Sequence, residues 1–485
     1  LGAAADQYDS IDMGAGTNTL QVSVANATSS GATSTTGAFY DATATTDPTI
    51  SNVTVAEYDM DGGSSGAAQG AITVDVTDAE ELTNTISIND GALTDMAAVT
   101  FKVTSIESGS TINLGKFDLT DSSSLIDLDL EDATGTADSL TVGLDIFETS
   151  GSSDAGTVDH LQIAGVETLT INVTSSDTDV LAATLTEIEA TSTTSLTLTG
   201  VENLVVSGFD GADTNTVDAT AVTGTVTLTA GADDQTLKGS DTAVTTFVMG
   251  ANLDGGDSLV GGAATTDTAS ATVTGLTATT GALTSTGVEV FDLTNTATAI
   301  VDFTGTTGVT AVSKNGLDAT ADVATLKGLD AGTAVTLGNG SASHVGALTV
   351  VLEDATGSTD SLTLNLTGLG TGGLTNLTTA GIETLNIVGG AAMDAQNISV
   401  LNVDASKIVV TGGNTSSAKD LELTGGTTGG TAGTVKLNAA TSEVDASGFN
   451  GVISAIAATN TATTFSTSVA GSLMTGGAKA DTFTV

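Results

Sequence analysis

The sequence predicts an all-β fold, and within that class an irregular parallel β-solenoid, a β-helix-like stack of strand-bearing turns. Three observations support this prediction: abundant glycine with almost no proline, alternation of apolar and polar residues, and short internal repeats. Of the 485 residues, 59 are glycine and one is proline. Disordered linkers are usually rich in both. Glycine alone suits regularly spaced turns, because it adopts positive φ without steric cost.

The strand prediction rests on residues that alternate with period two and are bounded by Gly, Asp, Asn and Ser. Aromatic residues make up only 3% of the chain, so the core is expected to consist of Val, Leu, Ile and Ala ladders. The alternating segments include 195–199, 225–229, 361–366 and 434–438. Helical patterns are scarce, and only 78–83 and 320–327 could each form a short turn or helix.

Two kinds of repeat occur along the chain. The acidic segment 131–141 matches 353–363 at nine of eleven positions, and 266–272 is a looser copy. The second repeat is a Gly-(Val/Ile)-Glu turn followed by an alternating strand. Its four copies begin at Gly165, Gly200, Gly287 and Gly381. Together they define a module: acidic turn, strand, spacer, Gly-(Val/Ile)-Glu turn, strand.

These repeats predict the domain organisation. Residues 121–250 form a first repeat module, 251–345 a second, and 346–485 a third that ends in a glycine-rich turn. Residues 1–120 lack the module and form an N-terminal β region. Within it, 50–120 could form a small Ig-like β-sandwich or continue the repeat array, and the sequence leaves both open.

Charge excludes several classes of partner. The chain has 58 acidic and 9 basic residues, for a net charge of −49. Nucleic-acid binding needs clustered Lys and Arg, so it is not expected, and neither is adhesion to an anionic membrane. No stretch reaches the roughly 18 apolar residues of a membrane helix. Salt screens most of the average repulsion, so the case for a bound cation rests on local clusters such as 127–132 and 233–234.

The segment 476–484 resembles the nonapeptide GGxGxDxUx of the RTX calcium-binding family. Calcium takes six to eight oxygen ligands, which converging carbonyls and an aspartate can supply. Lys479 departs from that motif, because it stands where the family has its third glycine. Degenerate relatives lie at 11–20, 231–239 and 253–262. Because no two intact nonapeptides occur in tandem, we expect isolated calcium turns rather than a regular β-roll.

These motifs and the Thr/Ala/Gly/Asp composition resemble bacterial surface-layer proteins of the RTX type, of the kind found in Caulobacter. The resemblance covers about 120–485 and, weakly, 1–30. It implies a calcium-dependent lattice protein that is exported by type I secretion and self-assembles on the cell surface. The partners it implies are other copies of the same chain, with cell-surface polysaccharide as a further candidate.

The candidate calcium ligands are the aspartates and glycines of these turns. The leading ones are Asp481, Asp257, Asp254, Asp233 and Asp234, with Gly476 and Gly477 in the C-terminal turn; Asp138, Asp267 and Asp360 recur by module. The alternative for each aspartate is a residue that caps its own turn. For the glutamates of the second repeat, we favour a strand-entry turn with the side chain facing water over a calcium or interface role.

No catalytic motif stands out, and we expect no enzymatic activity. The two histidines, His160 and His344, lack the His-Glu-x-x-His spacing of a zinc peptidase. The leading hypothesis is therefore a subunit of a calcium-stabilised surface layer. The alternatives are an RTX-type adhesin stalk or other extracellular filament, and the non-catalytic tail of a secreted hydrolase.

Overall fold

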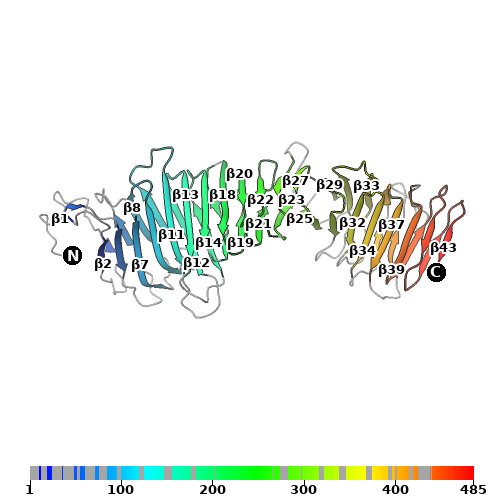
Figure 1. The fold of residues 1–485 in the computed structure, drawn as a ribbon, viewed down its shortest axis with the longest axis horizontal. Helices are drawn as coiled ribbons and strands as arrows, with labels where there is room; N and C mark the ends of the chain where they lie inside the picture. The colour runs from blue at the N-terminus through cyan, green and yellow to red at the C-terminus, as the bar shows by residue number, and fades with distance from the viewer. Residues whose placement is uncertain are drawn as a thin grey trace. The chain divides into compact units, whose positions relative to one another are not determined.

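A computed structural model gives the fold (Figure 1). The residues it describes are 10–12, 19–24, 35–36, 49–51, 55–60, 72–75, 85–94, 100–118, 125–146, 156–175, 182–200, 203–212, 214–264, 266–273, 282–295, 298–315, 322–337, 346–366, 374–390, 396–398, 401–413, 419–423, 437–438 and 440–485. Within these ranges the secondary structure is entirely β, with no helix, and the fold is a parallel β-solenoid. The all-β solenoid prediction is confirmed.

Contacts divide the chain into two compact units, 1–248 with 260–265, and 249–259 with 266–485. In the first unit, strands of successive turns pair in parallel in two ladders. One ladder runs through β2 (Thr19–Val24), β5 (Val55–Met60), β7 (Thr85–Thr94), β9 (Thr111–Asp118), β11 (Ser139–Ile146), β13 (Thr168–Thr174), β15 (Ser195–Gly200), β18 (Thr214–Val222) and β20 (Asp234–Lys238). The other runs through β3 (Thr35–Thr36), β6 (Ile72–Asp75), β8 (Thr100–Ile106), β10 (Leu125–Leu130), β12 (Gly156–Ala164), β14 (Ala183–Glu189), β16 (Leu204–Val206) with β17 (Phe209–Asp210), β19 (Val226–Thr229) and β21 (Thr245–Gly250).

The second unit repeats this plan with three parallel ladders. The longest comprises β23 (Thr268–Val273), β25 (Val290–Asn295), β28 (Ala311–Asn315), β30 (Ala334–Leu337), β32 (Ser361–Leu366), β34 (Thr384–Gly389), β37 (Lys407–Gly412), β39 (Glu443–Phe449), β41 (Thr464–Ser466) and β43 (Thr482–Thr484). The second comprises β26 (Ala299–Asp302), β29 (Val323–Leu329), β31 (Ala347–Leu352), β33 (Asn376–Ala380) and β36 (Leu401–Val403). The third comprises β35 (Gln396–Ile398), β38 (Lys419–Leu423), β40 (Val452–Ile456) and β42 (Ser472–Thr475).

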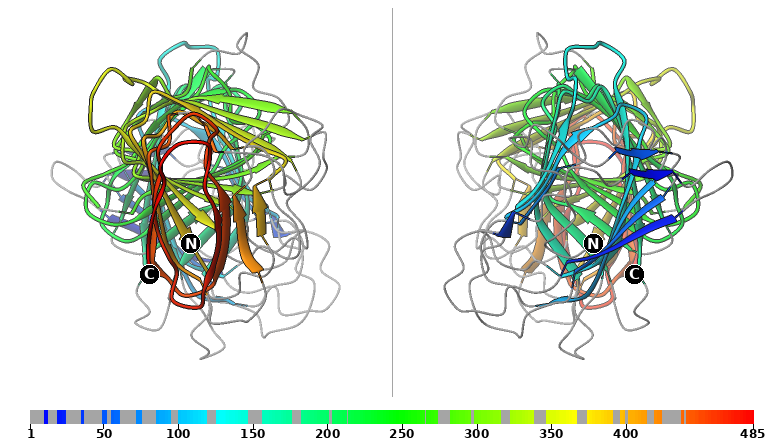
Figure 2. Two further views of the ribbon diagram at one scale, coloured as in Figure 1. Left: turned by 90° about the vertical axis from the view of Figure 1, so that its right-hand side faces the viewer. Right: turned by 90° about the vertical axis from the view of Figure 1, so that its left-hand side faces the viewer.

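Shorter strands complete the fold. They are β1 (Ser10–Asp12) paired with β4 (Thr49–Ser51), β22 (Ser258–Val260), and β24 (Thr284–Thr286) paired with β27 (Gly305–Thr307). In the end-on views of Figure 2, the C-terminal turns, drawn in orange and red, follow one another as loops of similar outline. Each turn therefore lays its strands directly on those of the turn before.

The core sits between the ladders and consists of stacked aliphatic side chains. Along β11, Leu140, Val142 and Leu144 are buried while the intervening residues are only partly covered. Leu140 stands in register with Leu169 of β13, which in turn stands in register with Leu196 of β15. Each such side chain contributes about 1.5–3 kcal/mol when it is fully buried. The period-two alternation in the sequence thus selects which residues face the core.

One core position holds a lysine. Lys314 of β28 is 0% exposed and lies in register between Leu293 and Leu337, both of which are buried. Its Nζ donates a hydrogen bond to the backbone oxygen of Asn315 at 2.6 Å. Backbone oxygens therefore accept hydrogen bonds from the Lys314 Nζ at a position that an aliphatic side chain occupies in the neighbouring turns.

The strands expected at 195–199, 225–229 and 361–366 are present as β15, β19 and β32. Of the strand expected at 434–438, only 437–438 lie within the described residues, and these two are not in a strand. The helix considered at 320–327 was wrong: Val323–Leu329 is strand β29, because Ala324 and Leu326 alternate into the core with period two. The other helical candidate, 78–83, lies outside the described residues.

The described strands of the N-terminal region run parallel to the strands with which they pair. Strands β5 through β9 between residues 55 and 118 all pair in parallel with strands of neighbouring turns. An Ig-like sandwich consists of antiparallel sheets, so this segment has the wrong strand direction for one. None of the described residues forms a helix long and apolar enough to cross a membrane.

Candidate functional site

Two acidic turns with the same internal structure occur, one in each unit. The turn 131–138 joins β10 to β11, and the turn 353–360 joins β31 to β32. In the first, Asp132 Oδ1 accepts hydrogen bonds from the backbone N and the Oγ1 of Thr134, at 3.0 and 2.6 Å. In the second, Asp354 Oδ1 accepts the same two bonds from Thr356, at 2.9 and 2.7 Å. The near-identical sequences of these segments therefore fold alike.

Each acidic turn lies directly against a Gly-(Val/Ile)-Glu turn. Gly165 has a φ of +74°, and a Cβ added there would lie 2.3 Å from the Cβ of Ala133. Gly381 has a φ of +70°, and its added Cβ would lie 2.5 Å from that of Ala355. Glycine is thus required for two reasons, the left-handed backbone and the close approach of the neighbouring turn. The two sequence repeats recur together because they are in contact.

The glutamate of the second turn binds the backbone of the first. The backbone amide of Asp138 donates to Glu167 Oε2 at 2.7 Å, and that of Asp360 donates to Glu383 Oε2 at 2.8 Å. The looser copy does the same, from Asp267 N to Glu289 Oε2 at 2.9 Å. In all three, the glutamate amide donates back to the aspartate carbonyl oxygen. For Glu167, Glu289 and Glu383, the favoured expectation of a side chain that faces water was therefore wrong, because their carboxylates fold back onto the preceding turn. Glu202 lies outside the described residues.

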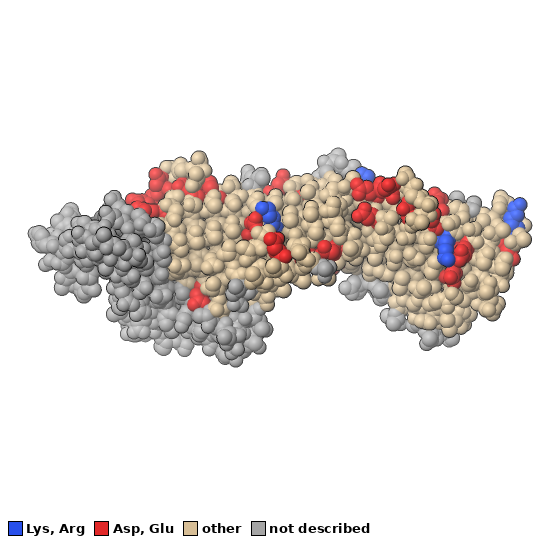
Figure 3. All heavy atoms as spheres, viewed as in Figure 1, with Lys and Arg blue, Asp and Glu red and all other residues tan. Residues whose placement is uncertain are grey.

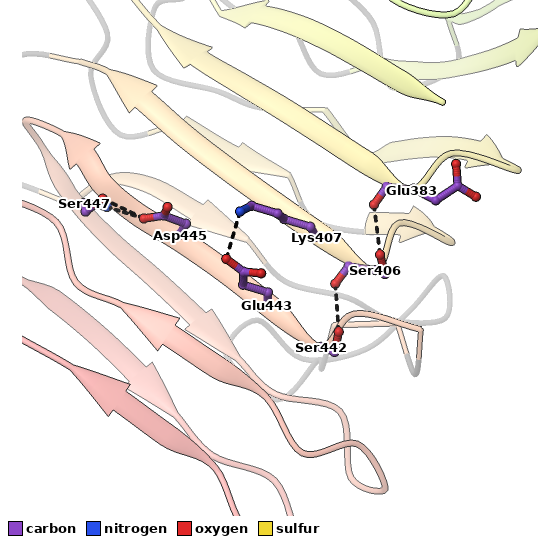
Figure 4. A network of polar contacts seen from close by, with 7 residues as sticks. All are labelled: Glu383, Ser406, Lys407, Ser442, Glu443, Asp445 and Ser447. Atoms are coloured by element: carbon purple, nitrogen blue, oxygen red, sulfur yellow. Dashed lines mark hydrogen bonds and ion pairs between the residues drawn. The ribbon is translucent and has the colours of Figure 1, made fainter. Parts of the chain in front are cut away.

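A third turn extends each of these contacts. The carbonyl oxygens of Glu167 and Glu289 accept hydrogen bonds at 3.3 Å from the hydroxyls of Thr194 and Thr310. Figure 4 shows the equivalent bond from Ser406 to the carbonyl oxygen of Glu383, at 3.2 Å. The repeating structural unit is therefore three stacked turns. The sequence repeats revealed only the first two turns. The third was missed because a lone Thr or Ser before a strand is not distinctive in a chain this rich in threonine.

One oxygen in each acidic turn lacks a partner. Asp138 Oδ2 and Asp360 Oδ2 each expose less than 1 Å² and have no hydrogen-bond partner within the described part of the chain. Both carboxylates fold over a glycine, since a Cβ on Gly135 would lie 2.3 Å from Asp138 Oδ2, and one on Gly357 would lie 2.6 Å from Asp360 Oδ1. A buried acceptor without a donor is energetically costly.

Lysines do not supply such a donor. In the described ranges, no lysine forms an ion pair with a carboxylate of either acidic turn. Four lysines instead lie opposite acids of an adjacent turn. The pairs are Lys102 with Asp127 (2.6 Å), Lys238 with Asp218 (2.9 Å), Lys327 with Asp302 (2.6 Å) and Lys407 with Glu443 (2.9 Å, Figure 4). On the face drawn in Figure 3, several patches of Asp and Glu have no lysine beside them.

The other predicted ligands lie apart from these turns. Asp481 Oδ1 accepts a hydrogen bond from Thr463 N at 2.9 Å. Asp257 is buried, and its Oδ2 accepts from Asp254 N at 2.9 Å, while Asp254 Oδ1 accepts from Gly256 N at 2.7 Å. These aspartates cap turns, which is the alternative that the sequence left open.

The remaining candidates also differ in environment. Asp233 and Asp234 are exposed at the start of β20, and Asp267 is 0% exposed. Gly476 lies under the Asp481 carboxylate, and a Cβ on Gly477 would lie 2.1 Å from the Ala458 oxygen. Within the described ranges, no three Asp, Glu or His side chains converge as a metal-binding group. Any cation held here therefore needs backbone or water oxygens in addition.

The sequence reasoning missed a recurrent aspartate cap. In three further copies of an Asp-x-(Thr/Ser) turn, Oδ1 of Asp218, Asp302 or Asp445 accepts bonds from both the backbone N and the hydroxyl two residues later. The hydroxyl and backbone bonds from Ser447 lower the pKa of Asp445. Equivalent hydroxyl and backbone bonds, from Thr134 and Thr356, lower the pKa of Asp132 and Asp354 respectively. The signal was present as an Asp followed two positions later by Thr or Ser at turns and strand ends.

Asp218 and Asp302 differ in one respect. Burial is the largest single effect on both aspartates, and by itself it raises the pKa. The hydrogen bonds from Thr220 and Lys238 to Asp218, and from Lys327 and Thr304 to Asp302, together lower each pKa below its ordinary value.

His160 lies on the outer face of β12, with Nε2 3.2 Å from Glu189 Oε2. His344 lies outside the described residues.

No protein-family model and no curated protein matches this chain.

Proposed function

We propose that this protein is a structural component of an extracellular surface layer, which assembles from copies of the chain and is stabilised by calcium. The observation that carries the proposal is the pair of matching acidic turns with a buried, unpartnered carboxylate oxygen in each. A cation would satisfy such an oxygen, and calcium is a cation that carboxylate and carbonyl oxygens bind well. The Gly/Asp motifs and their resemblance to RTX-type surface-layer proteins supply the cellular context.

The rest of the described structure is consistent with a scaffold. The polar contacts described above join one turn to the next, and the side chains that form them recur from module to module. A solenoid built in this way presents a long, regular surface, as repeat proteins do. Heterologous contacts between such subunits generate open arrays. The proposal assigns the chain no catalytic reaction.

An adhesin stalk or other extracellular filament is the second candidate. The parallel stacking of turns within each unit favours it, because a solenoid grows along one axis. The two candidates differ in dimensionality: a surface layer forms sheets, and a stalk forms fibres.

Electron microscopy of the purified full chain separates these outcomes. We expect two-dimensional sheets in millimolar calcium chloride, their dissolution in EGTA, and their return when calcium is restored. Fibres under the same conditions would support the filament instead. Sheets that persist in EGTA would overturn the calcium part of the proposal, and a monodisperse monomer at all calcium concentrations would overturn assembly.

A further inference from the structure

We propose that the acidic turns 131–138 and 353–360 are two equivalent calcium sites, one in each unit, and that the glycine-rich turn at 476–484 is not one. This inference rests on the proposed function for the choice of cation. The preference for these two turns among the sequence-based candidates comes from the unpartnered oxygens in the structure. It differs from the sequence-based ranking, which placed Asp481 first.

The first argument is the unpartnered oxygen. Asp138 Oδ2 and Asp360 Oδ2 are occluded from water and have no donor in the described part of the chain. An unsatisfied buried acceptor costs about 1–3 kcal/mol, and more when it is charged. The same cost arises at the same position in two separate units. A single such oxygen could be an accident of packing, but a repeated one indicates a site that a ligand completes.

The second argument is the position of glycine in these turns. The carboxylate of Asp138 occupies the space that a Cβ on Gly135 would fill, and Asp360 does the same over Gly357. Any other residue at these two positions would displace the carboxylate. The turns are therefore shaped around the aspartate side chain.

The third argument is the set of oxygens around each aspartate. Glu167 accepts the amide of Asp138 on one of its two carboxylate oxygens, Oε2. Glu383 accepts the amide of Asp360 in the same way. Asp132 and Asp354 lie in the same exposed turns, and each accepts bonds from a threonine on Oδ1. The exposed backbone of each turn adds carbonyl oxygens, which calcium accepts readily.

Calcium suits this irregular set better than magnesium. Magnesium demands near-octahedral geometry at short distances and dehydrates reluctantly, whereas calcium tolerates varied geometry and higher coordination. Because no three acidic side chains converge within the described residues, the charge count at each site is low. We therefore expect dissociation constants on the order of 0.1–1 mM, as in extracellular calcium modules.

The glycine-rich C-terminal turn lacks the decisive feature. Asp481 Oδ1 already accepts the backbone amide of Thr463 at 2.9 Å, which joins two turns without a cation. Lys479 adds a positive charge two residues earlier. This aspartate therefore acts as a turn cap, and Asp481→Asn is a matched control for substitutions at Asp138 and Asp360.

Calcium binding to the full chain tests the inference. Isothermal titration with calcium chloride, in low salt and with magnesium chloride as a second titrant, measures stoichiometry and selectivity. We expect two calcium ions per chain, with at least tenfold weaker binding of magnesium. Asp138→Asn and Asp360→Asn should each remove one ion, the double variant both, and Asp481→Asn neither. Far-ultraviolet circular dichroism confirms that each variant retains its β structure.

Three results would overturn the inference. They are retention of both ions in the folded double variant, loss of an ion in Asp481→Asn, and no binding at 10 mM calcium. The outcome is separable from that of the proposed function. If calcium binds at both sites but micrographs show no assembly, the calcium sites are supported and the surface-layer proposal is refuted. If the double variant still forms calcium-dependent sheets, the surface-layer proposal is supported and these two sites are refuted.

Discussion

Glu383 reaches back across one turn of the solenoid and accepts the backbone amide of Asp360 on its Oε2, at 2.8 Å. Asp360 returns the contact through its carbonyl oxygen, to which the amides of Glu383 and Thr384 donate at 2.8 and 3.1 Å. Two residues 23 positions apart in the sequence thus fix the register of two adjacent turns. The same relation recurs between Asp138 and Glu167 and between Asp267 and Glu289.

Removing this glutamate should loosen the turns. Glu383→Ala leaves the Asp360 amide without its acceptor, and hydrogen bonds to charged groups contribute about 1.5–3 kcal/mol. The site is only partly buried, so we expect the free energy of unfolding to fall by about 1–2 kcal/mol. Urea denaturation in EGTA measures this without interference from calcium. Glu131→Ala, at an exposed position, serves as the control and should change stability by less than about 0.5 kcal/mol. Equal effects of the two substitutions would contradict the cross-turn role.

The glycine of the second repeat should resist substitution more than an unconstrained glycine does. Gly381 and Gly332 both have positive φ, +70° and +92°, but an added Cβ at Gly332 meets nothing within 4 Å. Gly332→Ala should therefore cost only the backbone strain, about 1–2 kcal/mol. Gly381→Ala adds a clash with Ala355 and should cost at least about 1 kcal/mol more. Thermal unfolding of the two variants gives the difference, and a Gly332 variant that is equally or more destabilised would refute turn-on-turn packing.

The aspartate caps should make the protein sensitive to acid. Ser447 holds the pKa of Asp445 below its ordinary value near 3.8. A group whose pKa is lower in the folded chain stabilises the fold above its unfolded pKa, and this contribution is lost as the pH falls through the folded pKa. We therefore expect the free energy of unfolding to decline below about pH 4. In Ser447→Ala the decline should be shallower, because the hydroxyl bond is gone. A pH series of urea denaturation curves measures both, and identical slopes for the two proteins would disprove the assignment.

Lys314 should matter more than the surface lysines. Its side chain is wholly buried, and its Nζ donates to a backbone oxygen. Lys314→Ala removes a buried aliphatic stem and leaves that oxygen without this donor, so we expect a loss of at least about 2 kcal/mol. Lys407→Ala removes an exposed ion pair with Glu443 and should cost less than about 1 kcal/mol. Chemical denaturation of both variants measures the two losses. A larger loss of stability in Lys407→Ala than in Lys314→Ala would contradict the structural role given to Lys314.

The sequence predicted the candidate site only in part. Asp138 and Asp360 were identified because their segments repeat, and the same repetition identified Glu167 and Glu383. Their contact was not predicted, because the spacing between partners differs among copies at 29, 22 and 23 residues. Asp481 ranked above them on motif resemblance, yet a backbone amide already binds its carboxylate.

The sequence by itself determined the all-β solenoid. Period-two alternation of small aliphatic residues and glycine at turns leave few other ways to bury an apolar face. Only the tertiary structure decided which turn lies on which, because solenoid spacers vary in length while the ladder aligns strands by hydrogen bonding. That register brings the Glu383 carboxylate to the Asp360 amide, and it leaves the Asp360 Oδ2 buried without a partner among the described residues. Whether the oxygens of an aspartate find a donor depends on the neighbouring turn, which the local sequence does not contain.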